Sequence, residues 1–270
     1  MAGSKIRIGV LGAGGRMGRA IIAGIAGDPR LVLAGAIERA GHDSVGSRLG
    51  PPFPASMTIC SNHGPLAIAS DVLVDFTAPD ALSATLDAAC DGKAAIVIGT
   101  TGLEPKHYKL IDKASRNIAV LQSANTSLGV TLLLRLVEQA ARALGPEWDI
   151  EISELHHRDK IDAPSGTALA LGAAAAKGRG VDLAKVSDRG RDGVTGLRLP
   201  GHIGFAALRG GSAPGDHLVM FAGDGERIEI GHRVENRDIF ARGALKAAVW
   251  LAGKPAGRYT MDDVLGLPDL

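Results

Sequence analysis

Twelve consecutive residues near the middle of the chain carry groups that can move a proton and hold an anion. The segment 156–167 begins with His156 and His157, continues with Lys160, and ends in Ser165-Gly166-Thr167. Histidine can gain or lose a proton near neutral pH, and a lysine ammonium is a cation at that pH unless it is deeply buried. These residue types at this spacing predict proton transfer to a small anionic substrate.

The elements on either side of this segment suit that chemistry. An apolar run at 149–155 predicts a strand that leads into the histidines, and an Ala-rich run at 167–177 predicts a helix. The free N–H groups of a helix start, together with the hydroxyls, can cradle a carboxylate. The alternative is that Ser165 only caps the helix. If the strand continues through the histidines, their side chains point to opposite faces, so we expect no metal site.

A glycine-rich turn follows the apolar strand predicted over residues 5–11. Its sequence is Gly12-Ala13-Gly14-Gly15-Arg16-Met17-Gly18. A turn of this kind brings backbone N–H groups and the start of a helix to the pyrophosphate of a dinucleotide. The strict GxGxxG spacing is not kept, because Met17 stands where the third glycine would fall, and Gly12, Gly15 and Gly18 form a variant. A glycine-rich turn that binds no ligand is the alternative.

Two charged residues follow the next predicted strand, at 31–37. Glu38 stands about where an acidic residue bonds an adenine-ribose hydroxyl, and Arg39 could instead face a 2′-phosphate. A solvated loop charge is the alternative for Arg39. Because both residues are present, we expect NADH, NADPH or both as cofactor.

Two further turns lie at the carboxyl ends of predicted strands. They are Gly99-Thr100-Thr101-Gly102 and Ser123-Ala124-Asn125-Thr126. Ligands of open α/β sheets lie beyond this edge, so small polar residues there could line the nicotinamide. Ordinary strand-to-helix turns with capping hydroxyls are the alternative.

Strands and helices alternate through the first half of the chain, which is typical of a doubly wound parallel sheet. After Asn125 the pattern changes, because several strand-like runs follow one another without helices between them. We therefore predict an α/β protein with a Rossmann-like doubly wound parallel sheet and a second α+β domain built on a mixed sheet. The expected strands are 5–11, 31–37, 72–76, 94–98, 118–121, 149–155, 203–208, 217–222 and 227–232, the expected helices are 20–25, 79–90, 105–115, 130–144, 167–177 and 239–251, and 41–58 is expected as a loop.

The bulk composition excludes several classes of protein. A net charge of +1 over 270 residues gives no strong field for nucleic acid or a membrane surface, and 3% aromatic residues leave few stacking platforms. No run approaches the ~20 apolar residues of a membrane helix, and the N-terminal apolar run is too short for a signal peptide. Cys60 and Cys90 form no CxxC pair and are expected to be reduced, buried thiols. We expect a cytoplasmic protein with no nucleic-acid or membrane partner.

Several motifs together resemble the 4-hydroxy-tetrahydrodipicolinate reductase family, also called dihydrodipicolinate reductase. The His-His segment is highly specific to that family, whereas the glycine turn is shared with many dehydrogenases. The similarity covers nearly the whole chain. The motifs are 12–18, Asp75-Phe76-Thr77, 99–102, Glu154-Leu155-His156-His157-Arg158-Asp159-Lys160, Asp162-Ala163-Pro164-Ser165-Gly166-Thr167-Ala168, Pro200-Gly201-His202-Ile203-Gly204-Phe205 and Gly231-His232.

The resemblance implies a reductase that transfers hydride from NAD(P)H to a cyclic dicarboxylate imine in the diaminopimelate route of lysine biosynthesis. It implies a dinucleotide-binding domain at 1–127 with 238–270, and a substrate-binding and oligomerisation domain at 128–237 that assembles a homotetramer through its sheets. Thr126 departs from some relatives, which carry an aromatic residue beside the nicotinamide, so the cofactor preference stays open.

The resemblance also assigns roles to single residues. His156 is implied as the proton donor and acceptor and Lys160 as the second proton donor. His157, Ser165, Gly166 and Thr167 are implied as substrate-binding residues. The implied dinucleotide contacts are Gly12, Ala13, Gly14, Gly15, Arg16, Met17, Glu38, Arg39, Gly99, Thr100, Thr101, Ser123, Ala124, Asn125 and Thr126.

Two other functions are open to a chain with this plan. A semialdehyde-type dehydrogenase needs a nucleophilic cysteine, and neither Cys60 nor Cys90 lies in a motif suited to that role. A dinucleotide-sensing module would bind NADPH without turnover and has no need of the segment 156–167. Loss of the nicotinamide absorbance, with substrate generated in situ, distinguishes the three.

Overall fold

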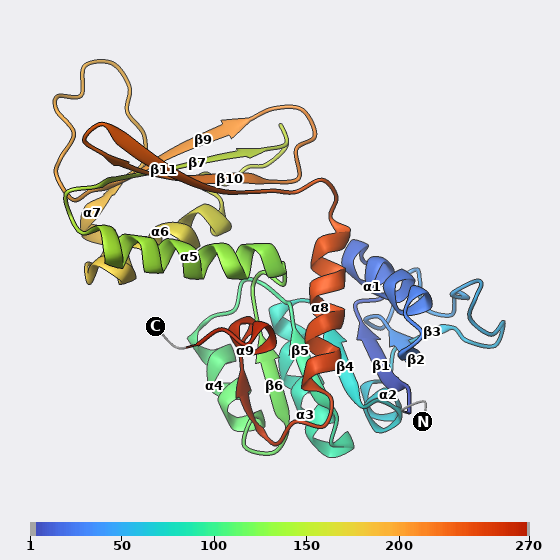
Figure 1. Cartoon of the computed structure of the whole chain (residues 1–270). Coiled ribbons are helices and arrows are strands. Elements are labelled where there is room, and N and C mark those ends of the chain that lie inside the picture. Colours follow the sequence, from blue (N-terminus) through green and yellow to red (C-terminus); the bar gives the residue numbers. More distant parts are fainter. Residues whose placement is uncertain (1–3, 269–270) are drawn as a thin grey trace. The chain divides into compact units, whose positions relative to one another are not determined.

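The computed structural model describes residues 4–268, which form two compact units (Figure 1). The first unit contains residues 4–127 together with Asp238–Pro268, and the second is Leu128–Arg237. Residues 1–3 and 269–270 of the predicted first domain lie outside the described residues. That the first unit binds the dinucleotide and the second binds the substrate remains a prediction.

The first unit is built on a parallel sheet of seven strands. In β1, β4 and β5 almost every residue is buried, because helices cover both faces of the sheet. The doubly wound sheet predicted from the sequence is therefore confirmed. In sheet order the strands are β12 (Gly257–Tyr259), β6 (Ala119–Gln122), β5 (Ala95–Ile98), β4 (Val72–Asp75), β1 (Ile6–Leu11), β2 (Leu31–Ile37) and β3 (Ile59–Cys60).

The helices of this unit pack in two groups (Figure 1). In one group α1 lies against α8, and a side chain at Gly24 would meet Leu245 at 2.6 Å, so the glycine permits the close approach. In the other group α2, α3 and α4 pack in sequence over a core that includes Leu66, Leu86 and Ile111. The helices are α1 (Arg16–Gly27), α2 (His63–Ala69), η1 (Pro79–Ala81), α3 (Leu82–Gly92), α4 (Pro105–Ala114), α8 (Asp238–Leu251) and α9 (Met261–Leu265).

The structure adds short elements that the sequence pattern did not predict. The strands β3 and β12 and the helices α2 and α9 carry too few residues to show a hydrophobic period. The expectation of buried cysteines was wrong for Cys60, which is exposed because it ends the edge strand β3, and Cys90 is only half-buried. Both thiols are free.

The second unit is a mixed sheet of five strands, as predicted, with α5 and α6 packed on one face (Figure 1). In β7 the side chains alternate, so that Ile150, Ile152, Glu154 and His156 are buried and the residues between them are less so. In sheet order the strands are β11 (Glu226–Arg233), β10 (Asp216–Gly223), β7 (Asp149–His156), β9 (Ile203–Arg209) and β8 (Ser187–Asp188), and the helices are α5 (Leu128–Leu144), α6 (Gly166–Arg179) and α7 (Leu183–Val186).

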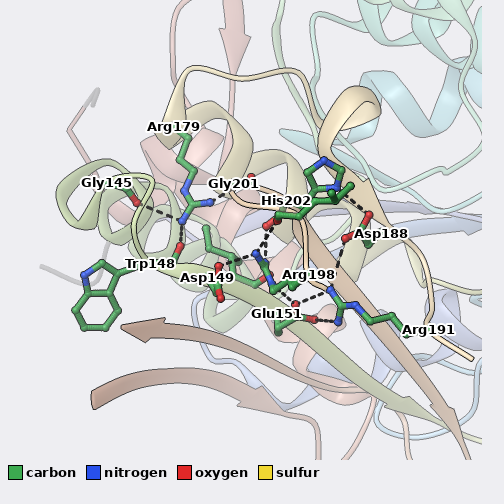
Figure 2. A network of polar contacts seen from close by, with 12 residues as sticks. Gly145, Trp148, Asp149, Glu151, Arg179, Asp188, Arg191, Arg198, Gly201 and His202 are labelled. Carbon is green, nitrogen blue, oxygen red and sulfur yellow. Dashed lines mark hydrogen bonds and ion pairs between the residues drawn. The ribbon is translucent and has the colours of Figure 1, made fainter. Parts of the chain in front are cut away.

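Arginines tie the loop 189–202 to the start of β7 (Figure 2). Arg198 contacts Asp149 Oδ1 at 2.6 Å and Glu151 Oε1 at 3.0 Å, and it also donates to backbone carbonyls. Arg191 pairs with the other side of Glu151 at 2.9–3.0 Å. These ion pairs hold the connection between β8 and β9 although most of its side chains are exposed. Among the described residues, no helix is long and apolar enough to cross a membrane.

Candidate functional site

Two adjoining cavities lie along the carboxyl edge of the parallel sheet in the first unit. The larger has a volume of about 420 Å³ and the other about 350 Å³, and they share Gly15, Phe76 and Thr77. This is the edge where open α/β sheets bind ligands. The larger is lined by Gly15, Arg16, Met17, Phe76, Thr77, Gly99, Thr100, Thr101, Ala124, Asn125, Thr126 and Phe240, and the other by Gly12, Gly15, Ile37, Glu38, Arg39, His42, His63, Phe76, Thr77, Ala78 and Ala81.

The glycine turn between β1 and α1 has the geometry of a dinucleotide turn. Gly12 has a φ of +81°, which favours glycine, and a side chain there would meet the Phe76 carbonyl oxygen at 2.6 Å. A side chain at Gly18 would lie 2.1 Å from the Gly12 carbonyl oxygen. Gly18 therefore performs the close helix–strand packing that the third glycine of the strict motif provides, one position later.

Glu38 closes the outer side of this turn. Its carboxylate accepts hydrogen bonds from the backbone N–H groups of Gly14 and Arg39, both at 3.0 Å. The acid is therefore held beside the turn, in the second cavity, where an adenine-ribose hydroxyl would be expected. The Arg39 side chain is exposed in the same cavity, so a guanidinium is also available to a phosphate.

The buried carboxylate of Asp75, at the end of β4, takes part in a hydrogen-bond network that reaches Thr100, just after β5. Thr77 donates to Asp75 Oδ1 through its N–H at 2.9 Å and through its hydroxyl at 2.6 Å, and its N–H also contacts Thr100 Oγ1 at 3.1 Å. Burial raises the pKa of the Asp75 carboxyl, and the hydrogen bonds from Thr77 and Thr100 partly offset that rise. This arrangement fixes the two threonines at the cavity wall.

All but three of the residues that the sequence placed in the dinucleotide site line these cavities. The exceptions are Ala13, which is buried under the turn, Gly14, whose N–H pairs with Glu38, and Ser123, whose hydroxyl donates to the Asn125 carbonyl at 2.7 Å. The sequence analysis did not place the following lining residues in the site: Ile37, His42, His63, Phe76, Thr77, Ala78, Ala81 and Phe240.

Some of the missed residues carried a signal and others did not. Phe76 ends the strand predicted at 72–76 and Thr77 follows it, at the same edge of the sheet, so their place could have been inferred. Phe240 lies on the C-terminal helix, and its backbone carbonyl accepts the Thr126 hydroxyl at 2.7 Å. Phe240 therefore supplies an aromatic side chain to the cavity, whereas Thr126, which lines the same cavity, is not aromatic. No local pattern links residues 114 positions apart in the sequence.

A second polar cluster lies at the end of β7 in the second unit, around the buried carboxylate of Glu154. Glu154 Oε2 lies 2.5 Å from His156 Nδ1, and Oε1 accepts the Ser165 N–H at 3.1 Å. Arg209 at the end of β9 forks onto both oxygens, at 2.8 and 3.0 Å. Burial raises the pKa of Glu154, but the bonds from Arg209, His156 and Ser165 outweigh it and the net pKa is lowered. The group is therefore a carboxylate at neutral pH.

Ser165 and the start of α6 adjoin this carboxylate. The Ser165 hydroxyl accepts the Ala168 N–H at 3.2 Å, so it does cap the helix, and it also lies 3.1 Å from Nε2 of His217. A side chain at Gly166 would meet no atom within 4 Å, which leaves open space beside the first turn of the helix. The N–H groups of such a first turn favour a bound carboxylate.

The basic groups of the segment 156–167 are placed differently from one another. His156 is buried, whereas His157 is half-buried and its N–H donates to the Ala213 carbonyl at 2.8 Å. Lys160 Nζ pairs with Asp162 at 2.7 and 3.0 Å, and this pair lowers the pKa of the Asp162 carboxyl. The ammonium is thus held by a carboxylate that is itself exposed.

His217 and Arg209 complete the cluster and were missed by sequence reasoning. His217 on β10 is buried, and its ring meets that of His156 edge-on at 5.1 Å between centroids. Burial, reinforced by the neighbouring His156, lowers the pKa of His217 to about 4. Neither residue lies in a recognisable motif, since His217 contacts Ser165 and Arg209 contacts Glu154 across more than 50 positions of sequence.

Three features of the first unit suit the binding of a dinucleotide. They are the turn that only glycines can form, the carboxylate of Glu38 beside it, and the small polar lining at the ends of β5 and β6. The second unit offers an imidazole, an ammonium and a helix start, which can protonate and bind an acidic substrate.

Comparison with known proteins finds similarity over nearly the whole chain. Residues 6–126 match the model of the dihydrodipicolinate reductase N-terminus, and residues 129–265 match that of the C-terminus. A 4-hydroxy-tetrahydrodipicolinate reductase of Methylocella silvestris is 49% identical, and one of Zymomonas mobilis is 52% identical, each over 98% of both chains. A dipicolinate-bound dihydrodipicolinate reductase of a Paenisporosarcina species has the same fold, with a TM-score of 0.76 and 23% identity over 95% of this chain and 97% of that one.

Proposed function

The chain belongs to the dihydrodipicolinate reductase family, and from that membership we propose how its two residue clusters share the reaction. The protein is an oxidoreductase of the diaminopimelate route to lysine. It reduces the cyclic dicarboxylate imine formed from 4-hydroxy-tetrahydrodipicolinate to tetrahydrodipicolinate, with NAD(P)H as the reductant. The first unit holds the dinucleotide, and the second holds and protonates the substrate.

The observation that carries this division is the bond network of Glu154. One buried carboxylate bonds both the proton-transfer histidine His156 and the N–H of Ser165 at the start of α6. The Glu154 carboxylate therefore holds both the proton donor and the anion-binding helix start in place. A small acidic substrate needs both groups at a fixed separation. The dipicolinate bound by the Paenisporosarcina reductase, a planar ring with two carboxylates, is chemically of this class.

The substrate carboxylate is bound by the first turn of α6. Gly166 and Thr167 contribute N–H groups, Ser165 and Thr167 contribute hydroxyls, and the open space beside Gly166 admits the ligand. The half-buried imidazole of His157, in the adjoining loop, contributes a further donor. Fixing the ring in this way supplies a large part of the rate enhancement, because it removes rotational freedom before the reaction.

Protonation is the task of His156 and Lys160. When bound, reduced nicotinamide supplies the hydride to the substrate ring. Negative charge then develops toward the ring nitrogen, and His156 and Lys160 offset it and deliver the one proton that balances the hydride. The ion pair with Asp162 holds the Lys160 ammonium in place, in the loop between the two histidines and α6.

The dinucleotide is bound at the sheet edge of the first unit by the lining residues described above. Glu38 is placed for the adenine-ribose hydroxyl of NADH and Arg39 for the 2′-phosphate of NADPH. The presence of both supports the use of either cofactor. Phe76 and Phe240, rather than residue 126, supply the aromatic side chains of the larger cavity.

The assembly and the location of the protein are proposed from its family. We propose a homotetramer formed through the sheets of the second unit, whose helices α5 and α6 cover only one sheet face and whose strands carry the exposed Leu208 and Ile228. A solution mass of four chains by light scattering is the expected result. We place the protein in the cytoplasm, where the family acts.

A coupled assay tests the proposed function. Substrate is generated in situ, and NADH and NADPH are supplied in parallel while the nicotinamide absorbance is followed. Substrate-dependent oxidation of either cofactor is expected. Cofactor binding without turnover would instead indicate a dinucleotide-sensing module. Turnover that is abolished by a thiol reagent and requires a semialdehyde would indicate the cysteine-dependent alternative.

A further inference from the structure

We propose that Glu154 is the positioning residue of the reaction: it fixes the tautomer and orientation of His156 and, with its other oxygen, the start of the substrate-binding helix. The inference rests on the proposed function, since it concerns the same proton transfer. Glu154 touches neither ligand in this scheme and acts through two neighbours. It deepens the assignment of His156 by explaining which ring nitrogen faces the substrate.

The hydrogen bond between Glu154 and His156 determines the tautomer. An ionised carboxylate can only accept hydrogen bonds, so Nδ1 of His156, 2.5 Å from Oε2, must carry the proton of that bond. Neutral His156 then has its lone pair on Nε2, and the imidazolium carries its transferable proton there. The histidine can donate and recover a proton at Nε2 without changing tautomer.

Arg209 keeps Glu154 ionised and immobile. The guanidinium forks onto both carboxylate oxygens and also donates to the backbone carbonyls of Lys160 and Asp162, at 3.3 and 2.6 Å. The carboxylate is almost completely buried, which makes each of these charge-assisted bonds strong. The same arginine therefore connects Glu154 to the loop that bears Lys160.

Two neighbours, Gly215 and His217, define the surroundings of the rest of the His156 ring. A side chain at Gly215, just before β10, would lie 2.8 Å from Nε2, so the glycine leaves room beside that nitrogen. The His217 ring packs edge-on against the His156 ring. With Nδ1 bonded and one flank packed, the imidazole has little freedom to rotate.

The second oxygen gives Glu154 a task that a simple acid–histidine pair does not have. Oε1 accepts the Ser165 N–H at 3.1 Å, at the cap of α6. The distance between the proton donor and the carboxylate cradle is thus set by one side chain. Loss of Glu154 should affect kcat through His156 and the substrate KM through Ser165.

The test uses Glu154→Gln, His156→Gln and the double variant. Glu154→Gln is expected to lower kcat about 10- to 100-fold, the usual loss when a partner that orients a functional histidine is removed. In the double variant, kcat should equal that of His156→Gln alone, because Glu154 has no residue left through which to act on the proton. The substrate KM should still rise, because the Ser165 contact is separate.

Glu151→Gln is the matched control. Glu151 lies on the same strand and is likewise held by arginine side chains, those of Arg191 and Arg198 (Figure 2). Side chains alternate along β7, so Glu151 lies on the sheet face opposite to His156. Its variant is expected to keep the wild-type kcat. Glu154→Asp, which retains the charge with a shorter reach, should recover part of the lost rate and serves if Glu154→Gln folds poorly. NADPH binding and Tm report the folding of each variant.

A spectroscopic readout separates positioning from a general structural effect. Histidine ¹⁵N NMR of the free protein should show His156, assigned by its loss in His156→Gln, as the Nδ1–H tautomer. Glu154→Gln should convert it to the Nε2–H form or a mixture. A retained Nδ1–H tautomer, or losses in kcat that multiply in the double variant, would overturn the inference. If His156→Gln itself kept the wild-type kcat, the proposed function of His156 would fail instead.

Discussion

Lys160 is the residue whose chemistry is easiest to isolate. Lys160→Ala is expected to lower kcat by about 10²- to 10⁴-fold, the usual contribution of a general acid. The fold should be kept because, within residues 4–268, the hydrogen bonds of the ammonium go to the exposed Asp162. Initial rates at saturating substrate measure the loss, and NADPH binding serves as the folding control. A rate near that of the wild type would remove Lys160 from the proton transfer.

Arg39 and Glu38 can be separated by the choice of cofactor. Arg39→Ala should weaken NADPH more than NADH, because only NADPH carries the 2′-phosphate that a guanidinium would bind. The side chain is exposed, so little change in stability is expected. Dissociation constants for both cofactors, measured by fluorescence of the reduced nicotinamide, provide the comparison. Equal losses for the two would discard the phosphate role.

At the scale of elements, the junction between the glycine turn and α1 leaves no room for a side chain at Gly18. Gly18→Ala would place a methyl group 2.1 Å from the Gly12 carbonyl oxygen and 2.7 Å from the Ala13 Cα, both of them backbone atoms. The turn must then move, and we expect a loss of about 1–3 kcal/mol in stability together with weaker dinucleotide binding. Calorimetric Kd values and Tm measure the two effects.

Gly27→Ala is the control for that substitution, because a side chain at Gly27, at the other end of α1, meets nothing within 4 Å. It should leave dinucleotide binding unchanged and slightly raise Tm, since alanine has the lower entropic cost in a helix. Equal cofactor affinities in the two variants would show that Gly18 does not support the turn.

The elements also show what a sequence can reveal. Long strands such as β1 and β2, and helices such as α5 with a clear apolar face, follow from their periodicity, and both chemical segments are contiguous in sequence. Strands of two or three residues, such as β3, β8 and β12, exist only because a longer neighbour offers them a partner. Arg209, His217 and Phe240 reach their sites through tertiary pairing, which no local pattern encodes.

For the whole molecule, His217 links stability to pH. Its pKa is lowered by burial to about 4 from an ordinary value of 6.5, so the unfolded chain binds more protons than the folded one between those values. Stability therefore falls as pH decreases from about 6.5 to about 4, by at most about 3 kcal/mol from this residue. Nδ1 of His217 has no hydrogen-bond partner within residues 4–268, which agrees with a neutral ring.

His217→Gln tests this linkage. A glutamine amide can still donate to the Ser165 hydroxyl but does not titrate, so the free energy of unfolding should fall less steeply between pH 7 and pH 5 than in the wild type. Some slope will remain, because burial also lowers the pKa of His63 and of His232. Urea unfolding at a series of pH values gives the two slopes. If the slopes were identical, the protons taken up on unfolding would bind to residues other than His217.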